Sequence, residues 1–182
     1  METPSDQDER ETKAGGTQQS LDHMIFLAAD LDTASSKLSS LGFTVLPGGQ
    51  HADGKTSNIL IILQDGVYLE FIAFADEAAK AGHWWGTKHE GWIDWCLAGT
   101  VPESTQGYDK AMTGGRKTTQ GKDIQWAVTF PDKELPRGRM PFFCQDITDR
   151  EDRVSLLYML LLFKMLTVCL GPTCVQSSRK RC

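Results

Sequence analysis

The apolar and polar positions divide the first half of the chain into a strand, a helix and three further strands. Residues 21–28 are mostly apolar over the length of one strand, which is typical of a strand covered on both faces. Asp30 can cap a helix, and Gly42 is suited to end it. Between them, apolar residues recur at helical spacing: Leu31, Ala34, Leu38 and Leu41. Three strands are then predicted, at residues 43–46, 59–63 and 68–74.

A loop with two adjacent glycines precedes the last two of these strands, and a similar loop occurs in the second half of the chain. Gly48-Gly49 with Gly54-Lys55 corresponds to Gly114-Gly115 with Gly121-Lys122, and an apolar strand, a turn and another strand follow each loop. The second half predicts strands and one helix in the same order: a strand at 92–98, a helix at 102–112, and strands at 123–130 and 140–147. The sequence therefore predicts an internal duplication.

The length and charge of the chain restrict the classes of partner. A chain of 182 residues, 40% of them hydrophobic, can build one sizeable core or two small modules that share one. The net charge is -5 and the basic residues are scattered, so no basic face is expected to bind nucleic acid. A small molecule is the expected partner.

The two ends of the chain differ in composition from the middle. Residues 1–19 are polar and acidic, which predicts a disordered tail and no secretory or transit peptide. Five cysteines without an export signal indicate a reducing compartment, here the cytoplasm, in which Cys96 and Cys144 would pack as small hydrophobic groups.

The segment after Val154 is leucine-rich without a regular period. Its apolar run is too short, and too interrupted by Lys164, to span a membrane, which needs about 20 apolar residues. It is either a buried or interfacial helix, or residues 155–182 are not native domain sequence because a reading frame or exon ends near Val154.

His23 and Glu70 lie in the first and last strands of the first unit. If those strands are neighbours in the sheet, the two side chains can meet on one face as nitrogen and oxygen ligands of a divalent metal ion. The alternative is a core histidine and a carboxylate whose charge is met by a lysine or by backbone donors. Because Glu70 lies between Leu69 and Phe71, its burial requires something positive or hydrogen-bond-donating opposite it.

Other candidate side chains are less specific. His51 in the glycine-rich loop could orient a ligand, act as a general base or be solvated. In the second half, the positions that correspond to His23 and Glu70 are approximately Asp94 and Gln145, with Cys144 as a one-residue alternative to Gln145. Four tryptophans are concentrated in residues 83–98 and either pack in the core or line a pocket: Trp84, Trp85, Trp92 and Trp95.

Taken in order, these motifs resemble the glyoxalase-like domain family of the vicinal oxygen chelate superfamily, which includes glyoxalase I, the bleomycin resistance proteins and the extradiol dioxygenases. The resemblance covers residues 21 to about 154 and rests on several short motifs: Leu21-Asp22-His23, Gly48-Gly49-x-His51, Gly54-x-x-x-Asn58, residues 68–74, His83-Trp84-Trp85-Gly86, Gly91-Trp92-x-Asp94-Trp95, Gly114-Gly115-Arg116, Gln125-Trp126 and Pro141-Phe142-Phe143.

The resemblance implies an α+β fold in which two βαβββ modules, at about 21–75 and 91–148, form a curved mixed sheet around a cleft. The glyoxalase-like domain would span residues 20–154. His23 and Glu70 match the metal positions of the first module, whereas the second module lacks the usual His or Glu. Members of the superfamily often pair modules between chains, so a homodimer is an option.

Three functions remain open. The leading hypothesis is a metal-dependent lyase or oxygenase for a small organic substrate with vicinal oxygens, in which Glu70, His51 or another carboxylate of the pocket moves the proton. The second is a non-catalytic binding module of the bleomycin-resistance kind, with the four tryptophans lining the cleft. The third is an inactive truncated product.

Overall fold

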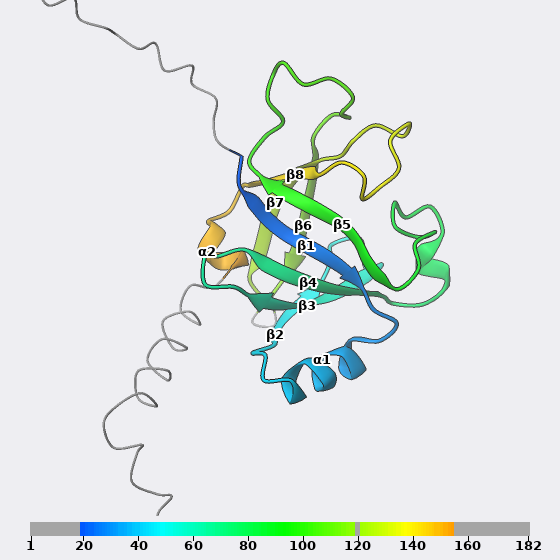
Figure 1. Cartoon of the computed structure of the whole chain (residues 1–182), viewed down its shortest axis with the longest axis vertical. Helices are drawn as coiled ribbons and strands as arrows, with labels where there is room; N and C mark the ends of the chain where they lie inside the picture. The colour runs from blue at the N-terminus through cyan, green and yellow to red at the C-terminus, as the bar shows by residue number, and fades with distance from the viewer. Residues whose placement is uncertain (1–18, 119–120, 155–182) are drawn as a thin grey trace, which may run out of the picture.

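The computed structural model describes residues 19–118 and 121–154, which form eight strands, two α-helices and a short 3-10 helix (Figure 1). In chain order the elements are β1 Leu21–Leu27, α1 Leu31–Ser40, β2 Leu46–Gln50, β3 Thr56–Ile62, β4 Tyr68–Phe74, η1 Ala78–Lys80, β5 Gly91–Ala98, β6 Met112–Lys117, β7 Asp123–Thr129, β8 Phe142–Asp146 and α2 Arg150–Arg153. Except for Gln19, the predicted tail lies outside the described residues, and so does the segment 155–182.

All eight strands belong to one mixed sheet in the order β2-β3-β4-β1-β5-β8-β7-β6. Each half pairs its first and last strands in parallel, β1 with β4 and β5 with β8, and the antiparallel pair β1 and β5 joins the halves. The sheet curls until its edges meet, where His51 pairs with Arg116 and the amide of Ala52 donates to Gly115 O at 2.8 Å. The predicted α+β class with a curved mixed sheet is confirmed.

The first half has a helix on the outer face of its strands, and the described part of the second half has none at the corresponding place. Asp30 caps α1 as predicted by accepting hydrogen bonds from the amides of Asp32 and Thr33. The helix predicted at residues 102–112 is wrong, because Gly107 has a positive φ of 83° and Tyr108 pairs with Pro131 as an isolated bridge. A segment that bends and pairs in this way cannot continue a helical hydrogen-bond ladder.

Both double-glycine segments are strands and not the predicted loops. In β2, a Cβ on Gly48 would lie 1.8 Å from Oδ1 of Asn58, and in β6 a Cβ on Gly114 would lie 2.7 Å from Nε1 of Trp126. The glycines therefore allow side chains of the neighbouring strands, β3 and β7, to fold across the backbone toward the inside of the sheet.

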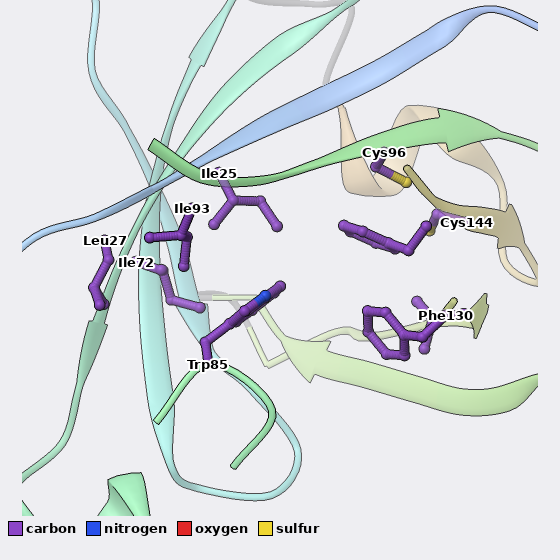
Figure 2. Packing of buried hydrophobic residues seen from close by; sticks show 10 residues of the cluster. Ile25, Leu27, Ile72, Trp85, Ile93, Cys96, Phe130 and Cys144 are labelled. Atoms are coloured by element: carbon purple, nitrogen blue, oxygen red, sulfur yellow. The ribbon is translucent and has the colours of Figure 1, made fainter. Parts of the chain in front are cut away.

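The main core lies inside the curved sheet (Figure 2). Ile25 and Cys96 are fully buried on the two central strands, and Trp85 reaches this core from the segment after η1. A second cluster lies on the outer face, where α1 packs against Ile59, Ile61 and neighbouring residues. Among the helices of the described residues, none has the length and apolar character needed to cross a membrane.

Candidate functional site

The concave side of the sheet encloses a cavity of about 290 Å³ lined by residues from both halves. Ligand pockets in proteins usually measure about 300–1,000 Å³, so this one suits a small molecule. Much of its wall is aromatic: Tyr68, Trp84, Trp85, Trp126, Phe130 and Phe142. Its polar side chains include His23, His51, Asn58, Glu70, His83 and Arg116.

A β-bulge in β1 places Asp22 beside His23. Leu21 pairs with Leu97 and His23 with Cys96, so β1 has one more residue than β5 in this interval. Asp22 and His23 are therefore both buried, although alternation in a regular strand would put them on opposite faces. Oδ1 of Asp22 lies 2.6 Å from Nδ1 of His23.

The charge on Asp22 determines which nitrogen of His23 faces the pocket. Burial raises the pKa of Asp22, but hydrogen bonds from Arg153 and His23 outweigh it and hold the pKa far below the usual range. The carboxylate is thus ionised and accepts a hydrogen bond from Nδ1–H of His23, which leaves Nε2 toward the pocket. A carboxylate that orients a histidine in this way is the usual second-sphere arrangement of metal-bound histidines.

Glu70 lies opposite that nitrogen on the neighbouring strand. Tyr68 is the parallel partner of His23, and Glu70 follows two residues later on the same face. Oε2 of Glu70 is 3.5 Å from Nε2 of His23, and Oε1 accepts a hydrogen bond of 2.6 Å from Nδ2 of Asn58. Burial raises the pKa of Glu70, but the nearby ring nitrogens of His51 and His23 and the hydrogen bond from Asn58 lower it to about 2.

His51 follows β2, at the point where the two edges of the sheet meet. Its Nδ1 lies 2.7 Å from Oγ1 of Thr56, and its Nε2 lies 3.5 Å from Oε1 of Glu70. One carboxylate therefore faces two imidazoles inside the pocket. The distances from Nε2 of His23 and from Nε2 of His51 to Glu70 are both 3.5 Å, longer than a normal hydrogen bond. They are close to the roughly 3.4 Å between two donor atoms of a tetrahedral metal ion.

The pair formed by His23 and Glu70 suits two ligands of a divalent cation, whereas His23, Glu70 and His51 are not a group of three whose ligand atoms all lie within 4.8 Å of one another. An ionised carboxylate and a ring nitrogen without a proton repel each other through their lone pairs unless a cation lies between them. A proton carried by either histidine can have this role, and so can a metal ion. Imidazole nitrogens together with a carboxylate are ligands that suit zinc or iron.

A second group of metal-ligating atoms lies nearby. Atoms of Asp22, His23 and Cys96 lie within 4.8 Å of one another. Both oxygens of Asp22 are engaged by Arg153, at 2.8 and 2.9 Å, and one also by Arg150. A metal ion there would have to displace a guanidinium, so the group around Glu70 is the better candidate.

The structure does not bring Asp94 and Gln145 to the pocket. Oδ2 of Asp94 accepts a hydrogen bond of 2.8 Å from Nε1 of Trp85, and its pKa is raised by burial. Gln145 is exposed. Strand register makes Cys96 and Cys144 the equivalents of His23 and Glu70 instead, because Cys96 pairs with Phe142 and Cys144 follows two residues later.

The four tryptophans named from the sequence divide into two pairs. Trp84 and Trp85 line the pocket. Trp92 and Trp95 are outside its lining, and Trp92 is 53% exposed, with its ring centroid 5.3 Å from that of Phe26.

Most of the pocket lining was not singled out as site residues from the sequence, and four of these residues are polar or aromatic groups with a clear structural origin. Asn58 and Trp126 pair with glycines of β2 and β6, and Arg116 follows Gly114 and Gly115 within β6, so only the double glycines could have indicated them. The fourth, His83, precedes Trp84 and has a pKa lowered to about 4, mainly by burial. Its Nδ1 accepts a hydrogen bond from the amide of Trp85, consistent with a neutral ring.

Comparisons with known proteins agree with this geometry. A family model described as "Glyoxalase-like domain" matches residues 21–157. No curated protein matches the chain. The crystal structure of a hypothetical protein from Staphylococcus aureus has a TM-score of 0.61 and 18% sequence identity, over 76% of this chain and 63% of that one. The chain thus spans less than two thirds of the length of that protein.

Two methylmalonyl-CoA epimerases are among the other solved structures that match the chain. The Streptomyces coelicolor enzyme in complex with 2-nitronate-propionyl-CoA has a TM-score of 0.48 and 15% identity, over 70% of this chain and 97% of that one. The Mycobacterium tuberculosis enzyme has a TM-score of 0.48 and 16% identity, over 69% and 87%. At such identities the likeness concerns the fold alone.

Proposed function

The chain belongs to the glyoxalase-like domain family, and on that premise we propose that it is a metal-dependent lyase or oxygenase for a small organic molecule with vicinal oxygens. The observation that supports this most directly is the 3.5 Å approach of Nε2 of His23 to the ionised carboxylate of Glu70 inside the pocket. Nε2 of His51 faces the other oxygen of Glu70 at 3.5 Å.

The residues around the proposed centre have separate tasks. Asp22 fixes the ring of His23, and Asn58 fixes the carboxylate of Glu70. A divalent metal ion held there would polarise the oxygens of a bound substrate and stabilise negative charge on them.

His51 is the residue best placed to move a proton. Its Nε2 lies near Glu70, its Nδ1 is held by Thr56, and its side chain is 18% exposed. The imidazole can therefore exchange a proton with solvent as well as with a ligand in the pocket.

Metal analysis of the purified protein tests this proposal. After equilibration with zinc or iron(II), the protein should hold about one metal ion per chain, and His23→Ala and Glu70→Ala should lose it. His89→Ala is the matched control because His89 is exposed and outside the pocket lining. Asp94→Ala and Gln145→Ala should also keep the metal. An intact protein that binds no divalent metal would refute the proposal.

A second candidate is a non-catalytic module that sequesters a planar ligand. The aromatic wall formed by Trp84, Trp85 and Trp126 favours it, as do the two cysteines at the second-half ligand positions. Ligand-dependent quenching of tryptophan fluorescence that a chelator leaves unchanged would support this candidate. Quenching that the chelator abolishes would support the metal-dependent function.

A further inference from the structure

Arg116 is a buried cation in the wall of the same pocket. It lies on β6 and is 6% exposed. Its side chain donates to two backbone carbonyls, to Gly48 O from Nη1 and to Arg153 O from Nη2, the latter at 3.2 Å. Within residues 19–118 and 121–154, no carboxylate lies within ion-pair distance of it.

The neighbouring Arg153 is a buried guanidinium with a structural role, and its partners differ from those of Arg116. Arg153 forms two hydrogen bonds with Asp22 and two with Asp146, so its charge is balanced. Arg116 has a full charge and five N–H donors, of which the two carbonyls account for only part. Burying a charge without a partner is unfavourable, and burial lowers the pKa of Arg116 accordingly.

We propose that the ligand of this pocket is an organic anion whose carboxylate or phosphate group pairs with Arg116. The planar fork of a guanidinium matches both groups and binds them through two parallel hydrogen bonds. The body of the ligand would lie against the apolar wall, to which Trp84 and Met112 contribute exposed surface. This inference deepens the proposed function by naming a substrate class, and it rests on that function only for the choice of pocket.

The charges of the other lining residues are compatible with an anion. Glu70 is negative, but His23 and His51 face it on both of its oxygens. A metal ion bound there would make the pocket more positive. Asp53 and Arg153 also line the pocket, but Asp53 forms no ion pair with Arg116 and Arg153 is already paired with Asp22 and Asp146. The charge that pairs with Arg116 is therefore left for the ligand to supply.

Calorimetric titration of chelator-treated protein with three matched probes tests the inference. 2-Naphthoate and 2-naphthyl phosphate carry an anion, and 2-naphthamide is the neutral counterpart. The wild-type protein should bind at least one anion about tenfold more tightly than the amide, as expected for hydrogen bonds to a charged group. Equal affinity for the amide and both anions, or no binding of either anion at millimolar concentration, would overturn the inference.

Variants locate the effect. Arg116→Gln should abolish the preference for the anion and leave the affinity for the amide unchanged, whereas Arg116→Lys should keep part of it. Arg137→Gln is the control, because Arg137 lies over the ring of Phe130 at 3.7 Å but outside the pocket lining. If Arg116→Gln does not fold, the comparison of probes in the wild-type protein and in Arg116→Lys still decides. An anion preference that survives intact in Arg116→Gln would refute the role of this residue.

The two proposals can fail separately. Anion binding that depends on Arg116 in a protein without metal affinity would leave the inference standing and remove the proposed function. Metal binding through His23 and Glu70 without an anion preference would do the opposite.

Discussion

Replacing Asp22 with asparagine should destabilise the whole fold. Asp22 is fully buried and connects β1 to α2, because its two oxygens accept hydrogen bonds from Arg153 at 2.8 and 2.9 Å and one also accepts from Arg150. It also accepts from Nδ1 of His23 at 2.6 Å. Asparagine keeps the shape of the side chain but removes the charge and turns one acceptor into a donor that faces a guanidinium.

The expected loss of stability follows from the buried charge of Arg153 that loses one of its partners. Removing one partner of a buried ion pair costs about 3–5 kcal/mol of stability, because the other charge stays buried. Arg153 is 4% exposed but keeps Asp146, which is itself partly exposed, so the lower end of the range is expected, about 3 kcal/mol. For a domain stable by about 5–15 kcal/mol this is a large fraction of the total.

Urea unfolding followed by circular dichroism measures the effect. With a slope of about 2 kcal/mol per molar urea, the midpoint of Asp22→Asn should fall by about 1.5 M. Asp123→Asn is the matched control, since Asp123 pairs with Lys117 on the surface and the loss should stay below about 1 kcal/mol. If Asp22→Asn lost less than about 1 kcal/mol, the ion pairs of Asp22 would not stabilise the fold as argued.

The remaining predictions concern one titration, one glycine and one core position. The pKa of Glu70 is lowered from 4.5 to about 2, so the ionised side chain stabilises the fold by about 3 kcal/mol above pH 4.5 and this stabilisation is lost as the pH falls toward 2. Over that pH window, the urea midpoint of Glu70→Gln should change less than the urea midpoint of the wild type. Gly49→Ala should lower the melting temperature markedly, because φ is +130° and the new Cβ would lie 2.3 Å from the carbonyl of Lys117; an unchanged melting temperature would refute this contact. Ile72→Ala, at 1% exposure, should cost about 2–5 kcal/mol in urea unfolding, whereas Leu41→Ala, at 74% exposure, should change little.

Several elements of the first half could be predicted because the apolar positions of each element show either the helical or the strand pattern. The capped helix and the strand at residues 68–74 match the sequence pattern closely. The meeting of His23 and Glu70 depended on one further condition, that β1 and β4 are neighbours, and the sheet order meets it. Local periodicity and one topological condition were sufficient for these features. They were not sufficient for β2, which was predicted at residues 43–46 with a glycine loop after it and lies at Leu46–Gln50.

The second half depended on contacts between residues far apart in the chain. The turn-rich segment around Gly107 pairs with residues near Pro131, which its local composition does not reveal. Arg116 reaches the pocket because the edges of the sheet close on each other, and its hydrogen-bond acceptors, Gly48 and Arg153, are 68 and 37 residues away in sequence. Neither feature leaves a periodic signal in the sequence.

The second-half ligand positions show how a shift of a few residues changes a chemical interpretation. Counting along the chain pointed to Asp94 and to Gln145 with Cys144 as the alternative, whereas the strand pairing selects Cys96 and Cys144. One source of the difference is irregular pairing, because β1 and β5 change register twice, at Asp22 and again between Ile25 and Phe26. The chain thus has a nitrogen and oxygen pair in one half and two buried thiols in the other. The proposed metal site therefore rests on His23 and Glu70, whose Nε2 and Oε2 face each other at 3.5 Å.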